Sequence, residues 1–397
     1  MTRHAEPPAS RTINERLSAV RGEQAGLRRV AFLIGQLELG GAEKQLSLLA
    51  RELRLRSIEV HVLLLSKGGP HEQTLREAGI GVHHLGFGRK PSGLPALRRN
   101  LVAFARLVVL LRGLRLDVLH AFLYESYMIG AVAARLARVP IVVAGRRGLR
   151  NRPDRPGWGS TLERAVNRVT DHVIANAAAV AEDARTVEHL PAHKLSVIYN
   201  GLPETAFDPA EPENIDTPLP VILCVANLLK IKGHRFLIDA AATLARQGNP
   251  CTIILVGDGP EYAPLQTQAT TLGLDVRFLG SRTDTAGLLA RADIVVLPSL
   301  SEGLSNAVME AMAAGRPTIA TSVGGTPELL EDRGLLVPPA DPAALAEAIT
   351  HLLTHPQHAT TLATAARAWA RKNLDATAMT IQHINLYHQL LETRCVE

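Results

Sequence analysis

Two carboxylates, Glu302 and Glu310, stand eight positions apart in the segment Leu297–Ala311. An apolar strand is expected to end at Leu297 and a helix to begin near Asn306, which puts Glu302 in the loop and Glu310 about one turn into the helix. The free N–H groups at a helix start stabilise an anion. Carboxylates that flank such a site are suited to accept hydrogen bonds from sugar hydroxyls and unsuited to bind phosphate. In the alternative interpretation, Glu302 caps the helix and Glu310 is a solvated surface acid.

A lysine and a glycine pair are further candidates for a site. Lys232 follows the apolar stretch Val221–Val225, and a fixed cation there would stabilise the negative charge that develops on a leaving group. Gly40 and Gly41 follow the first apolar stretch, where glycines let the backbone approach a ligand closely. The alternatives are an ordinary surface lysine and a tight turn without a ligand.

Apolar stretches alternate with helical patterns along most of the chain. The strand Val30–Gly35, a glycine turn, the helix Ala42–Arg56 and the strand Val60–Ser66 follow one another in the order of a βαβ unit. Because the apolar stretches are continuous, we expect parallel sheets covered on both faces, with ligands outside the carboxyl ends of the strands. Further strands are expected at Val82–Leu85, Val118–Phe122, Ile141–Ala144, Asp171–Ala175, Leu195–Tyr199, Val221–Val225, Thr252–Val256, Val276–Leu279, Ile294–Leu297, Thr318–Thr321 and Leu335–Val337.

A proline-rich stretch divides this pattern into two halves. We expect a flexible N-terminal tail over residues 1–27, a Rossmann-like domain over 28–203, a linker over 204–220 and a second Rossmann-like domain over 221–375. A last helix, about 376–397, is expected to pack back on the first domain. The predicted fold class is therefore α/β, with two Rossmann-like domains that face each other across a central cleft.

Composition and charge narrow the class of protein. The chain has 397 residues, of which 46% are hydrophobic, so each half can bury a core. No apolar signal segment stands near the N-terminus, and the apolar stretches are too short to span a bilayer, so we expect a cytoplasmic protein. Residues 89–115 include seven basic residues and no acidic one, a charge that could bind an anionic membrane at its inner face. A nucleic-acid binder would use the same charges, but no recognised module is present and aromatic residues are only 4%.

The segment around Glu302 and Glu310, with the pattern Glu-Gly-x-x-Asn-x-x-x-Glu-Ala, resembles the signature of the retaining GT-B glycosyltransferases, in particular glycosyltransferase family 4. The resemblance covers about residues 28–375 and rests on the order and spacing of several short motifs. These are Gly40-Gly41-Ala42-Glu43, Val197–Gly201, Val225–Leu228 with Lys232-Gly233, Gly257–Pro260 and Gly324–Glu328.

The resemblance implies a role for individual residues. Glu310 would bind the ribose of a nucleotide, Glu302 the hydroxyls of the donor sugar, and Lys232 the departing diphosphate, beside the amides of Asn306 and Ala307. The donor would be a nucleoside-diphosphate sugar, and neither a cofactor nor an essential metal is expected, since the chain contains no Asp-x-Asp motif. The predicted donor-binding residues are Gly40, Gly41, Asn227, Lys232, Gly257, Glu302, Gly303, Ser305, Asn306, Ala307 and Glu310.

Two positions depart from the family pattern. Asn227 stands where many members carry an arginine that acts with the lysine, and asparagine brings no charge to a phosphate. Lys230 or a basic residue of the first half would have to compensate. Members often carry His-x-His where this chain has His120 and Phe122. His120 is either a catalytic residue, together with Glu302 and Lys232, or a packed strand residue.

Arg146 and Arg147 are the predicted acceptor-side residues. They follow the strand Ile141–Ala144 at its carboxyl end, where they would hold an anionic acceptor such as a lipid pyrophosphate, unless they are ordinary surface charges. The predicted function is sugar transfer to a glycan or a lipid-linked acceptor in the synthesis of a cell-surface polymer. A GT-B nucleotide-sugar epimerase and a non-catalytic glycan-binding relative remain alternatives.

Overall fold

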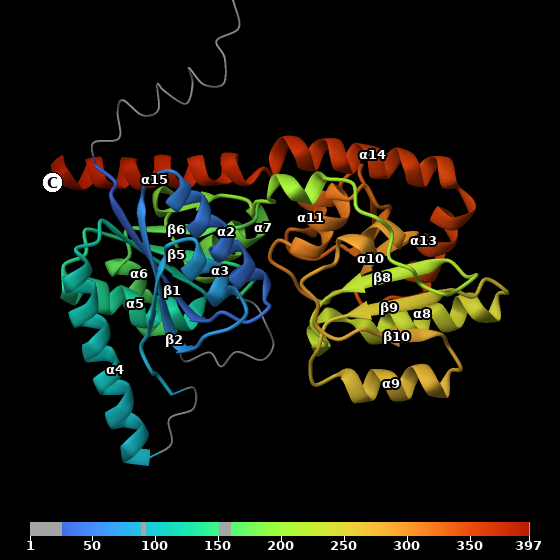
Figure 1. Ribbon diagram of the computed structural model, residues 1–397, viewed down its shortest axis with the longest axis horizontal. Helices are drawn as coiled ribbons and strands as arrows, with labels where there is room; N and C mark the ends of the chain where they lie inside the picture. Colours follow the sequence, from blue (N-terminus) through green and yellow to red (C-terminus); the bar gives the residue numbers. More distant parts are fainter. Residues whose placement is uncertain (1–25, 89–92, 151–159, 397) are drawn as a thin grey trace, which may run out of the picture.

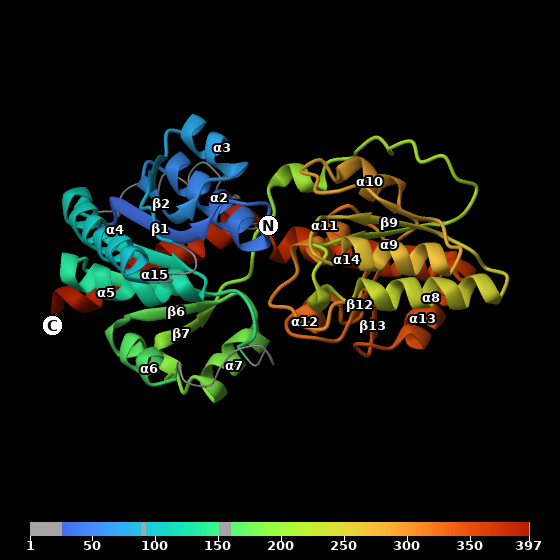
Figure 2. The same cartoon turned by 90° about the horizontal axis from the view of Figure 1, so that it is seen from below.

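The computed structural model describes residues 26–88, 93–150 and 160–396, so the predicted tail lies almost wholly outside the described residues. The described residues form two α/β domains that lie side by side (Figures 1 and 2), each built on one parallel sheet. This arrangement confirms the predicted fold class.

The described part of the N-terminal domain has a seven-stranded sheet with the order β3-β2-β1-β4-β5-β6-β7. All of its strand pairs are parallel, and the order reverses between β1 and β4. Such a reversal opens a crevice at the carboxyl ends of the strands. The strands are β1 (Arg29–Gln36), β2 (Glu59–Lys67), β3 (Gly81–His84), β4 (Val118–Phe122), β5 (Ile141–Arg146), β6 (His172–Ala175) and β7 (Leu195–Val197).

Helices cover both faces of this sheet, which explains why its strands are continuously apolar. Phe32 of β1 belongs to the core on the side of α2, whereas its neighbour Leu33 belongs to the core on the side of α5, because successive side chains of a strand point to opposite faces. The helices are α2 (Gly41–Leu55), α3 (His71–Glu77), α4 (Gly93–Leu114), α5 (Tyr124–Ala137), α6 (Ser160–Val169) and α7 (Ala178–Val187), with the 3₁₀ turn η2 (Ala192–Lys194).

The C-terminal domain repeats the plan with a six-stranded sheet, as far as the described residues extend, in the order β10-β9-β8-β11-β12-β13. Its strands are β8 (Val221–Val225), β9 (Thr252–Val256), β10 (Val276–Phe278), β11 (Ile294–Leu297), β12 (Thr318–Thr321) and β13 (Leu335–Val337). Its helices are α8 (His234–Arg246), α9 (Tyr262–Thr271), α10 (Ala286–Arg291), α11 (Asn306–Ala313), α12 (Thr326–Leu330), α13 (Pro342–Thr354) and α14 (Pro356–Asn373), with the 3₁₀ turns η3 (Glu204–Phe207) and η4 (Lys230–Lys232).

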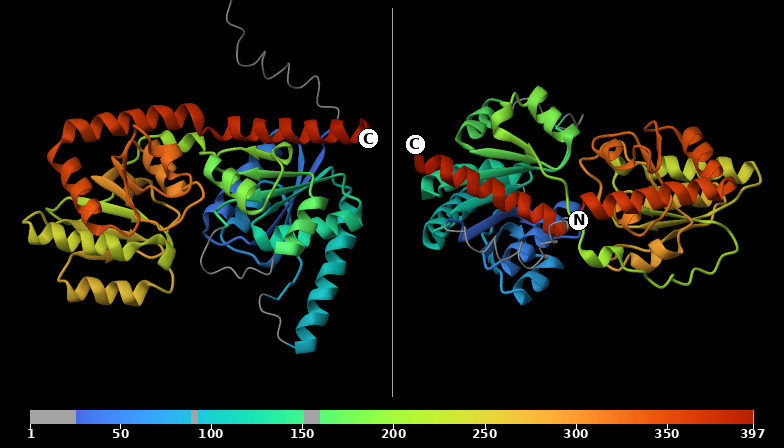
Figure 3. Two further views of the ribbon diagram at one scale, coloured as in Figure 1. Left: turned by 180° about the vertical axis from the view of Figure 1, so that it is seen from behind. Right: turned by 90° about the horizontal axis from the view of Figure 1, so that it is seen from above.

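The chain crosses between the domains at two places that lie side by side. The Leu202 N–H donates to Leu374 O at 2.7 Å, and the Ala376 N–H donates to Leu202 O at 3.0 Å. The helices at the C-terminal end are therefore interrupted here as well as at Pro356, which begins α14 because its ring suits the first position of a helix and cannot continue one. The last helix, α15 (Ala376–Val396), lies along the N-terminal domain, almost end to end with α14 (Figure 3).

Helix α15 packs into the N-terminal core through buried aromatic side chains. Tyr387 is fully buried, and its hydroxyl lies 2.7 Å from Nδ1 of His120 on β4. His383 is also buried, and its Nδ1 lies 2.9 Å from Met379 O. Burial lowers the pKa of His383 to about 3, and it lowers the pKa of His120 well below its usual range. Both imidazoles are therefore neutral in the folded protein.

The buried His383 predicts a loss of stability in acid. Its pKa is about 3 in the folded protein and about 6.5 in the unfolded chain, so at pH values between these only the unfolded chain binds the proton. Between pH 8 and pH 5 this difference removes about 2 kcal/mol of stability. We expect His383→Gln to flatten the pH dependence by that amount in urea unfolding. His189→Asn, which changes an exposed histidine, is the control, and an equal acid loss in both variants would contradict the assignment.

Candidate functional site

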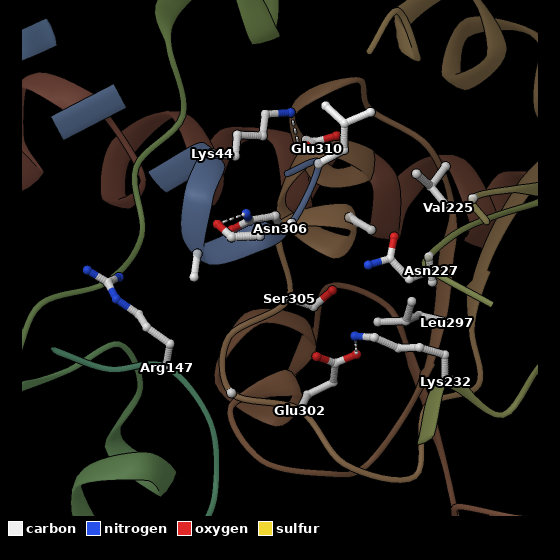
Figure 4. Close-up of a pocket in the computed structure, with 18 of the residues that line it drawn as sticks. Lys44, Arg147, Val225, Asn227, Lys232, Leu297, Glu302, Ser305, Asn306 and Glu310 are labelled. Atoms are coloured by element: carbon white, nitrogen blue, oxygen red, sulfur yellow. Dashed lines mark hydrogen bonds and ion pairs between the residues drawn. The ribbon is translucent and has the colours of Figure 1, made fainter. Parts of the chain in front are cut away.

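A cleft of about 390 Å³ lies between the two domains (Figure 4). Its walls are the segments that follow β1, β4 and β5 on one side and β8, β9 and β11 on the other, so the cleft lies at the carboxyl ends of both sheets. Ligands of this fold class bind there. The predicted residues that line the cleft are Gly40, Gly41, Arg147, Asn227, Lys232, Gly257, Glu302, Gly303, Ser305, Asn306, Ala307 and Glu310.

Glu302 is a buried, ion-paired carboxylate in the loop between β11 and α11. The Lys232 ammonium donates to Oε1 of Glu302 at 2.6 Å, and the Ser299 hydroxyl donates to the same oxygen at 2.7 Å. Only 7% of Glu302 is exposed. Because both contacts use Oε1, the second carboxylate oxygen, Oε2, is the one that can accept from a ligand.

Two loops from different strands bring Lys232 to Glu302. Lys232 ends the 3₁₀ turn η4 after β8, and the Leu300 N–H after β11 donates to Ile231 O at 2.8 Å. This backbone bond joins the two loops beside the charged pair. Figure 4 shows the Lys232 and Glu302 side chains pointing toward each other below Ser305.

Ser305, and not Glu302, caps helix α11. The Ser305 Oγ accepts from the Val308 N–H at 3.4 Å, so the alternative in which Glu302 is the cap is wrong. The next N–H groups toward the cleft are those of Asn306 and Ala307, and no described residue accepts a hydrogen bond from them. Free N–H groups at a helix start favour a bound anion.

Glu310 and the Asn306 side chain reach across the cleft to the N-terminal domain. The Lys44 ammonium donates to Oε1 of Glu310 at 2.7 Å, and the Glu310 side chain is 15% exposed. The Asn306 amide donates to Gly41 O at 3.0 Å and accepts from Asn200 at 2.8 Å. Glu310 is therefore not the solvated surface acid of the alternative interpretation.

Lys44 is a site residue that the sequence analysis missed. It stands in the first turn of α2, three positions after Gly41, and that position was the signal that could have identified it. Lys44 and Arg147 are the basic residues of the N-terminal domain that line the cleft within the described chain. They line the same cleft as Asn227, which has no charge of its own, whereas Lys230 does not line it.

The two predicted acceptor-side arginines have different environments. Arg147 lines the cleft, donates to Asn200 Oδ1 at 2.6 Å and lies 4.5 Å from the centre of the Phe122 ring, and burial lowers its pKa to about 10. Arg146 is instead buried and donates to both carboxylate oxygens of Glu188, at 3.0 and 2.8 Å. The acceptor-side prediction for Arg146 is corrected, because its charge is already neutralised inside the domain.

His120 is likewise a packed strand residue. It is fully buried, it contacts Phe122 and Tyr387, and it does not line the cleft. The prediction of a direct catalytic role for His120 is therefore corrected in favour of the alternative stated for it. Its ring instead helps to fix α15 against β4.

The described residues contain neither a cluster of His, Cys, Asp or Glu that could hold a metal ion nor a helix with the length and apolar character of a membrane span.

Comparisons with known proteins agree with this geometry. Residues 40–201 match the model of the Glycosyl transferase 4-like domain, and residues 219–355 match the model of the Glycosyl transferases group 1 domain. HepE of Anabaena, solved with UDP and with UDP-glucose, is 27% identical, and its UDP complex has a TM-score of 0.75 over 91% of this chain and 100% of HepE. This chain therefore has the GT-B fold and carries both domain types.

Curated relatives align over shorter regions. The alpha-D-kanosaminyltransferase of Streptomyces kanamyceticus is 33% identical over 35% of this chain and 37% of that enzyme. A GDP-mannose-dependent monoacylated alpha-(1-6)-phosphatidylinositol monomannoside mannosyltransferase of Corynebacterium glutamicum is 32% identical over 46% of this chain and 51% of that enzyme. The chain thus spans about half the length, or less, of these curated relatives.

Proposed function

We propose that this protein is a retaining glycosyltransferase of family 4. It transfers a sugar from a nucleoside-diphosphate sugar to a glycan or lipid-linked acceptor in the synthesis of a cell-surface polysaccharide or glycoconjugate. The observation that carries the proposal is the Lys232–Glu302 pair, 2.6 Å apart, beside the start of α11 in the cleft between the domains.

The donor would lie along the C-terminal side of the cleft. Glu310 accepts the ribose hydroxyls through Oε2, because Lys44 occupies Oε1. The diphosphate lies at the Asn306 and Ala307 amides, where the helix start favours an anion. The donor sugar then reaches Glu302, whose Oε2 accepts from its hydroxyls.

The reaction requires stabilisation of a departing diphosphate. The bond from the anomeric carbon to the phosphate oxygen breaks while the acceptor oxygen bonds to that carbon on the same face. The acceptor's proton passes to the leaving phosphate oxygen, so no protein base is required. Lys232 and the α11 amides stabilise the growing charge, and such preorganised donors contribute most where water is excluded.

A nucleotide-sugar epimerase is the alternative with the same fold and donor. It would need acid and base groups around the sugar, and the pair at Glu302 supplies a single carboxylate there. An epimerase converts its donor without an acceptor, so a time course with donor alone distinguishes the two activities.

Donor binding is expected to raise the melting temperature. At a free ligand concentration of 100 times Kd, binding to the folded state adds about 2.7 kcal/mol of stability. We expect one member of a panel of UDP-, GDP- and ADP-sugars to raise the melting temperature. Glu310→Ala should abolish this shift, because the ribose hydroxyls lose their hydrogen-bond acceptor. Glu347→Ala, which changes an exposed glutamate on α13, should keep the full shift. A full shift in Glu310→Ala would refute the site.

The outer face of α4 supports contact with an anionic membrane on the acceptor side. Its first half, Gly93–Val102, buries none of its side chains, and Leu94, Leu97 and Leu101 are 77%, 54% and 60% exposed. Figure 1 shows α4 extending beyond the rest of its domain. A helical segment as short as Gly93–Val102 is marginal in water without packing, and such exposed apolar side chains indicate an interaction surface.

The charges on α4 favour an anionic bilayer as its partner over a second copy of the chain or a nucleic acid. Arg98, Arg99 and Arg106 are exposed, and the helix contains no acidic residue. A second copy of the chain would bring like charges together, and a nucleic acid would leave the leucines without apolar contacts. An anionic bilayer accommodates both, with leucines among the acyl chains and arginines at the headgroups.

Binding to vesicles tests this surface. We expect the protein to sediment with vesicles of phosphatidylglycerol and phosphatidylcholine, less so at high salt, because screening weakens the arginine contacts. Replacing Leu94, Leu97 and Leu101 together by Ser should weaken binding at least about tenfold. The control replaces Leu55, Leu136 and Leu272, which are exposed elsewhere. Equal binding by both triple variants would contradict the proposal.

A further inference from the structure

Helix α7 of the N-terminal domain has its N-terminal cap supplied by the other domain. The residue before the helix is Ala177, whose side chain cannot accept a hydrogen bond. The carboxylate of Glu328 on α12 accepts instead. Its Oε2 accepts from the Ala178 N–H at 2.8 Å, and its Oε1 accepts from the Ala179 N–H at 2.9 Å. A carboxylate at this place satisfies two otherwise unpaired N–H groups and interacts favourably with the positive end of the helix.

Glu328 receives a third hydrogen bond from the N-terminal domain. The Tyr199 hydroxyl donates to Oε2 of Glu328 at 2.9 Å. Burial and this bond raise the pKa of Tyr199 to about 12, so the hydroxyl keeps its proton at neutral pH. Within the described residues, the three groups that donate to this carboxylate therefore all belong to the opposite domain.

The segment that carries Glu328 also supports the Glu302 loop. The Gly325 N–H donates to Gly303 O at 2.7 Å. A Cβ at Gly325 would lie 2.6 Å from the Cβ of Ala177, so a larger residue would hold the two domains apart. Figure 2 shows α12 and α7 facing each other across the boundary between the domains. The loop that holds Glu302 and the cap of α7 are thus joined by one short stretch of chain.

We propose that Glu328 is a positioning residue that holds the two domains closed over the donor, an inference that rests on the proposed function. When the domains separate, water accepts from the N–H groups of α7 in place of Glu328. Water also donates to the Glu328 carboxylate in place of those N–H groups. The exchange of hydrogen bonds is therefore reversible. Closure brings Lys44 and Arg147 to the residues of the C-terminal domain that line the cleft. Glu328 itself does not line the cleft and acts only through this closure.

Solution scattering without donor tests the closure directly. Glu328→Gln keeps the size of the side chain but removes its charge and turns one accepting oxygen into a donor. We expect this variant to have a larger radius of gyration than the wild type. Glu331→Gln, which changes an exposed glutamate three positions on, should scatter as the wild type does. Identical scattering by all three proteins would overturn the proposal, whatever the protein's activity.

Turnover and donor affinity separate a positioning role from a structural one. We expect Glu328→Gln to reduce kcat by about tenfold, in line with the strength of a carboxylate at a helix start, while the Kd of the donor stays within about twofold. A purely structural role would weaken donor binding as much as turnover, and that result would overturn the inference. Failure of every variant and of the wild type to bind any donor would instead reject the proposed function and leave the scattering result standing.

Discussion

The Lys232 ammonium and the Glu302 carboxylate lie 2.6 Å apart in the cleft, and the geometry of the site depends on this pair. Burying either charge alone is costly, because water no longer solvates it. The two loops that carry the charges are therefore held by each other's side chains as well as by the backbone bond between Leu300 and Ile231. Within this arrangement, one oxygen of Glu302 and two amides of α11 remain for a ligand.

Under the proposed function, both domains contribute residues to the substrate site. The C-terminal domain presents the start of α11, Glu302 and Lys232, while the N-terminal domain adds Lys44, Arg147 and the Gly40-Gly41 turn. Several contacts cross between the halves, including Lys44 with Glu310 and α7 with Glu328. Under the proposed function, a site divided in this way is complete only when the domains are closed, so turnover depends on domain position.

Local signals made the fold and much of the site predictable. Continuous apolar stretches predicted parallel strands, and Glu302, Ser305, Asn306 and Glu310 fall within one short strand–loop–helix segment. The residues whose roles were predicted wrongly are placed by partners that are distant in sequence. Arg146 is neutralised by Glu188, and His120 is covered by Tyr387 of the last helix. The role of Glu328 depends on a helix about 150 positions earlier in the chain. No periodicity or short motif encodes such pairings.

Substitution of Lys232, the charged partner of Glu302, tests whether this pair acts in the reaction. Once the donor and acceptor are identified, we expect Lys232→Ala to lower kcat by about 10²–10³-fold, as the loss of one hydrogen-bond donor to a developing anion does. Lys230→Ala changes an exposed lysine of the same turn that does not line the cleft, and it should remain within about twofold of the wild type. Equal turnover by both variants would contradict a role of the Lys232 charge in the reaction.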